Sequence, residues 1–255
     1  MQRVAALTGA GLVERKFPSP DSPVGDTHLL WGAAEEICSP AYWAAQAWMW
    51  EIDDPHHYRL GETFEEEVLA CLLGGYGIPA EVGLAAYERL RTELQRCPLA
   101  LTDSDHVYQL LREPLNVRGR LVRYRFARQK ATYLAGTMSA LSYVDTQADD
   151  RRLRDQLTEL PGIGPKTASW IVRNLRGSDD VSILDVHVLR AGRILGIFPG
   201  RWTVHRHYRP LEDAYLTFAR AIGVRASILD SVMWMTMRRL PAGLRGELIG
   251  GLRSA

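Results

Sequence analysis

Apolar residues recur every three or four positions along most of the chain, the spacing that gathers them on one face of an α-helix. The segments that show it most clearly run through Phe64, Val68 and Leu72, through Leu153, Leu157 and Leu160, and through Val188 and Leu195. Strict alternation of apolar and polar residues, which would indicate strands, is scarce. The pattern therefore predicts a mostly α-helical protein.

Capping residues and glycines mark where these helices begin and end. Ser39, with a proline next, is a predicted helix start, because serine accepts free N–H groups and proline suits the first turn. A second start is predicted at Asp103 or Ser104. The first apolar run is interrupted by the glycines at positions 74, 75 and 77. We therefore expect short helices joined by tight turns.

The chain has 255 residues, 46% apolar and 24% charged, as in soluble globular enzymes. It has no uncharged apolar run of about eighteen residues, and Met1–Gly11 lacks the features of an export signal. We therefore expect a cytoplasmic protein without a membrane partner. Residues 1–30 hold several glycines and prolines and are expected to form an irregular N-terminal arm.

The cysteines Cys38, Cys71 and Cys97 are widely spaced and form no CxxC pair. Neither a disulfide framework nor a zinc or iron–sulfur site is predicted, so we expect no metal and no cofactor. All three are interpreted as core thiols.

The net charge is only +1, but the charges are segregated along the chain. Acidic residues dominate from Trp31 to Glu93. Basic residues dominate two later sets, which are Arg112, Arg118, Arg120, Arg123, Arg125, Arg128 and Lys130, and then Arg190, Arg193, Arg201, Arg206, Arg209, Arg220 and Arg225. This distribution permits one basic face for nucleic acid, and it is equally compatible with ordinary solvated helix faces.

Lysine is rare: the chain has only Lys16, Lys130 and Lys166, and arginine serves elsewhere. A Schiff base needs a primary amine that can lose its proton, which a guanidinium cannot do. A lysine within a special motif is therefore a candidate nucleophile. The alternative is that the arginine bias reflects genome composition and the lysines are accidental survivors.

Such a motif lies in the sequence PGIGP. A helix over Arg151–Leu160 is ended by Pro161, the glycines Gly162 and Gly164 form a tight turn, and a second helix begins near Pro165. Glycines and the free N–H groups of a new helix together let a phosphate approach closely. The segment is a helix-hairpin-helix, which positions DNA through its backbone, although GxG turns alone are common.

Asp185 in SILDVHVLR ends an apolar run and stands where the helix through Val188 and Leu195 would begin. A carboxylate held there by N–H groups can face the positive charge that develops on a sugar as its glycosidic bond breaks. An isolated aspartate at this position would be only a helix cap. The presence of Lys166 nearby in the sequence favours the catalytic interpretation.

LPGIGPKTA and DVHV resemble the helix-hairpin-helix (HhH-GPD) DNA glycosylases, the superfamily of endonuclease III and 8-oxoguanine DNA glycosylase. The likeness spans roughly Glu62 to Arg239. It implies that Lys166 is the nucleophile of a bifunctional glycosylase/lyase, Asp185 the essential carboxylate, and His187 a contact to a DNA phosphate. The chain has no cysteine cluster near its C-terminus, which excludes the iron–sulfur subgroup and favours the 8-oxoguanine branch.

Two further segments resemble the family. FEEEVLACLLGGYGIPAEVGLAAYERL is similar to the segment whose loop fills the gap left by an extruded base, which makes Tyr76 a candidate wedge. Members usually carry Gln or Asn there, so the glycines around Tyr76 put the preference for the opposite base in doubt. RYRFARQKATYLAG resembles the basic helix ahead of the hairpin, which implies DNA backbone contacts by Arg128 and Lys130.

Base recognition is assigned to the C-terminal run SILDSVMWMTMRRL. Asp230 and Trp234 are four residues apart and so share one helix face, a pairing that resembles the archaeal 8-oxoguanine glycosylases. It implies that the carboxylate accepts from the purine N–H edge and the indole stacks on its face. The alternative for Trp234 is core packing. Trp43 could add a second stacking wall, and Gln46 a hydrogen bond to a base edge.

The resemblance implies two helical lobes of the HhH-GPD fold with the active site in the cleft between them. One lobe is expected to be discontinuous, from 31–60 and 183–255. The other is expected at 61–182 and contains the helix-hairpin-helix at 151–176.

The function predicted is that of a DNA glycosylase with AP lyase activity, acting as a monomer on double-stranded DNA that contains a modified base. The expected base is 8-oxoguanine, excised through a lysine Schiff base. One alternative is a glycosylase of the same fold for a bulkier base, for example in foreign phage DNA. Another is a non-enzymatic helix-hairpin-helix module, which would need neither Lys166 nor Asp185.

Overall fold

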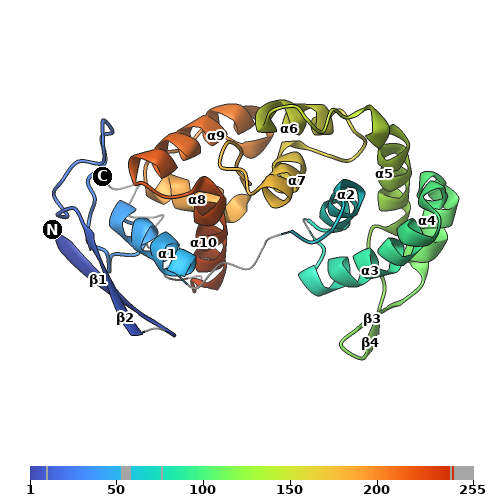
Figure 1. Cartoon of the computed structure of the whole chain (residues 1–255), viewed down its shortest axis with the longest axis horizontal. Coiled ribbons are helices and arrows are strands. Elements are labelled where there is room, and N and C mark those ends of the chain that lie inside the picture. The colour runs from blue at the N-terminus through green and yellow to red at the C-terminus, as the bar shows by residue number, and fades with distance from the viewer. Residues whose placement is uncertain (10, 53–58, 76, 242, 244–255) are drawn as a thin grey trace. The chain divides into compact units, whose positions relative to one another are not determined.

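The computed structural model describes residues 1–9, 11–52, 59–75, 77–241 and 243, and helices dominate them (Figure 1). The predicted mostly α-helical class is confirmed. The chain divides into two compact units, Met1–His57 with Asp179–Ala255, and Tyr58–Ser178. The expected divisions after residues 60 and 182 lie close to these boundaries. No helix in the described ranges is long and apolar enough to cross a membrane.

The first unit combines a β-hairpin with helices. Its elements are β1 (Gln2–Thr8), β2 (Gly11–Phe17), α1 (Pro40–Ile52), α8 (Val186–Ile194), α9 (Val204–Ala221) and α10 (Ala226–Arg239). Helix α10 packs against α1, α8 and α9, and its Leu229 and Met233 are fully buried in the core of the unit. The helix start predicted beside Ser39 is confirmed, because α1 begins at the next residue.

The hairpin overturns the expectation of an irregular N-terminal arm. Strands β1 and β2 pair antiparallel, with Gln2 opposite Phe17, and alternate residues of β1 are half-buried and exposed. Gln2 also donates its side-chain amide to the carbonyl oxygens of Pro18 and Gly32, each at 2.8 Å. The expectation was wrong because most of the glycines and prolines in this region follow Phe17, outside the paired strands.

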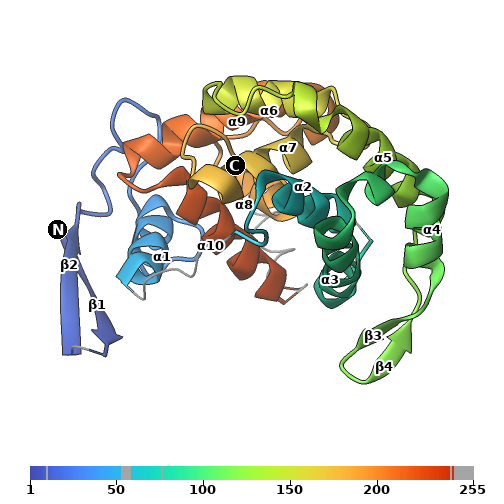
Figure 2. The same ribbon diagram turned by 45° about the vertical axis from the view of Figure 1, so that its right-hand side comes forward.

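The second unit is helical apart from one short β-ribbon, which extends from its helices in both views (Figures 1 and 2). Its elements are α2 (Phe64–Leu73), α3 (Ala80–Arg96), the 3-10 helix η1 (Pro98–Thr102), α4 (Ser104–Arg112), β3 (Leu115–Val117), β4 (Arg120–Val122), α5 (Ala127–Ala140), the 3-10 helix η2 (Leu141–Tyr143), α6 (Asp150–Thr158) and α7 (Pro165–Arg176). Helix α2 packs against α3, α5 and α7. The predicted start of α4 is confirmed, because the Asp103 carboxylate caps it.

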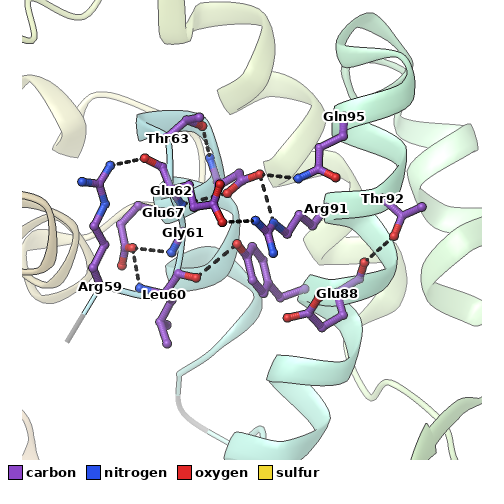
Figure 3. Close-up of polar contacts among 12 residues, drawn as sticks. Arg59, Leu60, Gly61, Glu62, Thr63, Glu67, Glu88, Arg91, Thr92 and Gln95 are labelled. Atoms are coloured by element: carbon purple, nitrogen blue, oxygen red, sulfur yellow. Dashed lines mark hydrogen bonds and ion pairs between the residues drawn. The ribbon is translucent and has the colours of Figure 1, made fainter. Parts of the chain in front are cut away.

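A buried carboxylate at the start of α2 holds the segment that leads into this unit (Figure 3). Glu67 is fully buried, and its Oε2 accepts the N–H groups of Leu60 and Gly61, each at 2.8 Å. Its Oε1 accepts from Asn174 Nδ2 of α7 at 2.7 Å. Glu67 therefore ties the entering chain and α7 to one end of α2.

The neighbouring Glu66 forms a second group of bonds, with Glu62, Arg91 and Gln95. It accepts the Glu62 N–H at 2.8 Å, Arg91 Nε at 3.0 Å and Gln95 Nε2 at 2.9 Å. Burial raises the pKa of Glu66, but these bonds and the Arg91 charge outweigh burial and hold the pKa at about 2. The carboxylate is thus an anion at neutral pH.

The cysteines divide between the core and the surface. Cys38 and Cys71 are buried, as expected, but Cys97 is exposed directly after α3. Its interpretation as a core thiol was wrong, because the chain leaves the helix at this residue and turns into η1.

Candidate active site

The turn between α6 and α7 is built around two exposed glycines, as the sequence predicts. Gly162 has φ +75°, and a Cβ built on it would lie 2.5 Å from ring atoms of Tyr133. Gly164 precedes α7 without a side-chain cap, and a Cβ there would meet nothing within 4 Å. The N–H groups of these two glycines have no acceptor within the described part of the chain. The turn therefore offers free donors and a positive helix end to an anion.

Lys166 is the second residue of α7 and is half-buried beside this turn. None of the described residues forms a hydrogen bond or ion pair with its amine. One helical turn further on, the ring of Trp170 lies 3.1 Å from where a Cβ of Gly74 would be. The lysine helix thus packs against the end of α2, and the amine remains available for a ligand.

A second lysine lies close to the first. Burial lowers the pKa of Lys130, and the positive charge of Lys166 lowers it further. The amine of Lys130 donates to the carbonyl oxygens of Leu72 and Gly74 at the end of α2. In this structure the amine bonds to a helix end of its own unit, and the expected phosphate contact stays a prediction. The sequence shows that Lys130 is a basic residue in a helix, but it does not indicate that the amine bonds to these carbonyl oxygens.

Arg128, the other backbone contact expected from α5, is at the surface. Its guanidinium pairs with Asp105 at 2.8 Å and lies 3.8 Å from the centroid of the Tyr108 ring. Both charged side chains are mostly exposed, so the pair is weak and can be replaced by another anion. The candidate wedge Tyr76 lies outside the described residues.

Asp185 caps α8, as predicted. Its Oδ1 accepts the N–H groups of His187 at 2.7 Å and Val188 at 2.9 Å. These bonds fix the carboxylate at the positive end of the helix, and Oδ2 accepts no hydrogen bond from the described residues. One carboxylate oxygen is therefore held and the other is left for a ligand.

Helices α8 and α10 bring other predicted residues together within the first unit. The rings of His187 and Trp234 meet edge to face, with centroids 6.4 Å apart and planes at 83°. Trp234 is 38% exposed, and the Arg238 guanidinium lies 4.9 Å from its ring centroid. Asp230, one turn earlier, is 2% exposed, and its Oδ1 accepts from Ser231 Oγ at 3.0 Å. The indole is accessible to a base, whereas the carboxylate lies deeper.

Helix α1 carries the two remaining recognition candidates, and they differ in burial. Gln46 is half-buried, on a helix that packs against α10. Trp43 is fully buried in the core of the unit, where its ring meets Tyr42 edge to face. The expected stacking role of Trp43 is therefore wrong for this structure, because no ring face is open to a base.

Glu66, Glu67 and Tyr124 were not identified from the sequence. These residues support helix α2, which packs against the helix of Lys166. The buried Tyr124 hydroxyl donates to the Leu73 carbonyl oxygen at 2.7 Å, beside the carbonyls that Lys130 bonds. A signal for Glu66 was present: Thr63 with a glutamate three residues later is a capping box, and Thr63 Oγ1 accepts the Glu66 N–H. No comparable pattern marked Glu67 or Tyr124.

No group of three or more His, Cys, Asp or Glu side chains in the described ranges is placed to hold a metal ion.

Residues 62–224 match the family described as 8-oxoguanine DNA glycosylase. The chain belongs to this family. The match includes both Lys166 and Asp185, and the resemblance seen in LPGIGPKTA and DVHV is confirmed. The hairpin β1–β2 lies before the matched residues.

Curated relatives carry the same description. The 8-oxoguanine DNA glycosylase/AP lyase of Methanocaldococcus jannaschii is 28% identical over 183 residues, 69% of this chain and 81% of the relative. That of Saccharolobus islandicus is 26% identical over 140 residues, 51% of this chain and 67% of the relative.

Solved structures share the fold at low identity. The 8-oxoguanine DNA glycosylase of Thermotoga maritima has a TM-score of 0.56 and 22% identity, covering 76% of this chain and 95% of its own. A trapped covalent intermediate of endonuclease III with DNA has a TM-score of 0.55 and 22% identity, covering 75% and 80%. These likenesses confirm the helix-hairpin-helix glycosylase fold.

Proposed function

We propose that this member of the 8-oxoguanine DNA glycosylase family excises a modified base from double-stranded DNA and then cleaves the strand through its lyase activity. The observation that carries the proposal is Lys166, whose amine has no partner among the described residues and which lies in the first turn of α7, directly after the open PGIGP turn. A DNA phosphate bound at the turn would bring a sugar toward this amine.

Lys166 supplies the nucleophile. The base must first leave the stack, because no side chain reaches C1′ inside a duplex. The neutral amine then forms a bond to C1′ as the glycosidic bond breaks, and the base leaves with the bonding electrons and takes up a proton. Opening of the sugar ring gives an imine. Loss of a C2′ proton then expels the 3′ phosphate, so excision and strand cleavage share one intermediate.

Asp185 supplies the negative charge. Its Oδ1 is occupied by two N–H groups, so the carboxylate cannot swing away while positive charge grows on the sugar. A fixed anion stabilises that charge without reorganisation at the moment of reaction, which is the largest single contribution in many enzymes.

The base is proposed to be 8-oxoguanine. The curated relatives carry that substrate in their names, and Trp234 presents an exposed indole beside His187. Asp230 on the same helix would accept from the purine N–H edge once the base is stacked. An enlarged base, such as one in foreign phage DNA, is the competing substrate, because the glycines at positions 75 and 77 carry no side chains that would fill space beside the candidate wedge.

The test is a panel of duplexes that each hold one modified base, incubated with the enzyme as a monomer and then reduced with borohydride. We expect a covalent complex with 8-oxoguanine DNA that is lost in Lys166→Gln. Lys166→Arg keeps the positive charge but cannot form an imine, so it should bind DNA and still fail to be trapped. Lys16→Gln removes the same charge from the exposed face of β2 and should leave trapping unchanged.

The panel separates the parts of the proposal. Trapping of Lys166→Gln would show that another amine reacts and would refute the assigned nucleophile. Trapping only with an enlarged pyrimidine would replace the substrate and leave the roles of Lys166 and Asp185 intact. Binding without excision of any base would favour the non-enzymatic module.

A further inference from the structure

The β3–β4 ribbon is a short antiparallel hairpin. Its turn places Arg118 at φ 51° and Gly119 at φ 79°, and the Asn116 side chain accepts the Gly119 N–H at 2.9 Å. Two consecutive left-handed residues form the tight turn whose twist matches that of paired strands. Arginine is disfavoured in this conformation, so its presence suggests that the side chain has a use.

One side of the ribbon is anchored and the other is open. Leu115 is buried, and β3 packs against α3. Leu121, by contrast, is 76% exposed, and Arg120 before it and Arg123 after it in the sequence are also exposed. In both views the ribbon projects from the helices of its unit (Figures 1 and 2). An apolar side chain, with an arginine close before it and another close after it in the sequence, is thus presented to solvent on the ribbon.

The charge of this region has one sign. No aspartate or glutamate occurs between Pro114 and Val144, a span that contains five arginines and Lys130. Arg118 pairs with Glu81 at 3.3 Å, but both side chains are largely exposed. Arg120 and Arg123 form no ion pair within the described ranges. Such a surface fits a polyanion, because phosphates would neutralise charge that the protein leaves uncompensated.

The base of the ribbon adjoins the loop that follows α2. A Cβ on Gly77 would lie 3.5 Å from the Phe126 ring and 3.8 Å from Arg125 Nη1. This loop carries the candidate wedge at position 76. The segment that follows the ribbon therefore lies beside Gly77 within one unit.

We propose that the β3–β4 ribbon is a second DNA-binding element, which contacts the duplex to one side of the modified base. Arg120 and Arg123 bind phosphates, and Leu121 makes an apolar contact in the groove between them. The inference rests on the proposed function, in which the modified base leaves the duplex stack. It adds a contact that the helix-hairpin-helix turn does not supply.

The experiment measures the affinity of the full chain for a duplex holding a stable abasic-site analogue over a range of salt concentrations. Each phosphate contact adds about 0.9 to the slope of log affinity against log salt, so Arg120→Gln/Arg123→Gln should lower the slope by about 1.8. The control is Arg96→Gln, which removes a charge from the same unit. It should leave the slope within about 0.5, because Arg96 is neutralised by Glu93.

Trimming the duplex locates the contact. One flank of the duplex, on the side that the ribbon contacts, is shortened from about one helical turn (about 10 base pairs) to half of that. This should weaken binding of the wild type and affect Arg120→Gln/Arg123→Gln much less. Shortening the other flank should weaken both equally. Excision by saturating double variant in a single turnover should match wild type, because the ribbon holds DNA and not the reacting sugar.

An unchanged salt slope in Arg120→Gln/Arg123→Gln, or equal loss from trimming in both proteins, would overturn the inference. The proposed function would then still stand if wild type binds and excises. If wild type itself neither binds nor excises, the proposed function fails first. Leu121→Ser should weaken binding without changing the slope, and a changed slope there would contradict its apolar role.

Discussion

Helices α7 and α8 begin in opposite ways, although each start carries one of the two residues assigned to the chemistry. Helix α7 follows Gly164, which has no side chain to cap it, and Lys166 stands in its first turn. Helix α8 follows Asp185, whose carboxylate takes two N–H groups for itself. One positive helix end is left open, and the other is filled by the protein.

The difference teaches how one local structure serves two purposes. An open helix start attracts an anion from outside and holds DNA without reading its sequence. A filled start holds its own anion in a fixed position, where it can oppose a positive charge that appears later. The glycine or aspartate before the helix decides between the two outcomes.

The largest expected effect comes from removing the charge at the filled start. Asp185→Asn should keep the cap, because asparagine accepts the same N–H groups, and the free energy of unfolding should change by less than about 1 kcal/mol. Excision should fall by several orders of magnitude, because the neutral amide cannot stabilise the developing positive charge. Single-turnover excision and thermal unfolding measure the two effects separately.

Asp185→Ala is the matched comparison, since it removes both the charge and the cap. It should lose about 1 kcal/mol of stability beyond Asp185→Asn while losing a similar amount of activity. Near-normal turnover of Asp185→Asn would show that the aspartate is only a helix cap. The start of α8 would then have no catalytic role.

Much of this comparison could be predicted from the sequence, because both helix starts are local structures. PGIGP encodes the turn through its glycines and prolines, and Asp185 precedes a clear apolar repeat. The starts of α1 and α4 followed from the same capping rules. Sequence patterns therefore identify residues whose contacts lie within a few positions of them along the chain.

Positions that depend on packing between distant segments could not be predicted. The spacing of the tryptophans does not reveal that Trp43 is buried and Trp234 is partly exposed. Their burial depends on how α1 and α10 pack against each other. The Lys130 amine is bonded to carbonyls nearly sixty residues earlier in the chain. The N-terminal hairpin could not be predicted because apolar residues do not mark one face of it: the cross-strand pair Leu7 and Leu12 is exposed.

A smaller effect is expected from the recognition residues that accompany the filled start. Trp234→Ala and Asp230→Asn should each slow excision of 8-oxoguanine by about ten- to a hundredfold, which corresponds to one lost stacking or hydrogen-bonding contact. Cleavage at a preformed abasic site should be unchanged, because that substrate has no base to stack or pair.

The ratio of the two activities decides the interpretation. Equal losses on both substrates would indicate structural damage, a real risk for Asp230 because it is 2% exposed. Asp230→Asn preserves the shape of the side chain for this reason. Trp43→Phe, in the core, should change stability more than the ratio, and a specific loss of base excision there would restore its recognition role.

At the open start of α7, the two glycines are expected to affect different properties. Gly164 should affect DNA binding about tenfold, and Gly162 should affect stability. Gly164→Ala adds a methyl group with nothing within 4 Å, so it should leave stability unchanged and weaken DNA binding about tenfold by blocking close approach of a phosphate. Gly162→Ala, at φ +75° and against Tyr133, should instead lower the melting temperature. Binding isotherms and melting curves should therefore rank the two variants in opposite orders, and identical ranks would contradict a phosphate site at Gly164.

The smallest effect on activity is expected at the start of α2, where Glu66 accepts the Glu62 N–H of the segment that precedes the helix. Glu66 has a pKa of about 2 against an ordinary 4.5, so its anion stabilises the fold fully above pH 4.5, and this contribution is lost as pH falls toward 2. Glu66→Gln should lower the free energy of unfolding at pH 7 by about 1–3 kcal/mol, and the two proteins should converge near pH 2. The exposed Glu65→Gln is the control and should do neither. Denaturant titrations at several pH values measure the free energy of unfolding of both proteins. If the difference between Glu66→Gln and wild type were the same at every pH, α2 would require the shape of this side chain and not its charge.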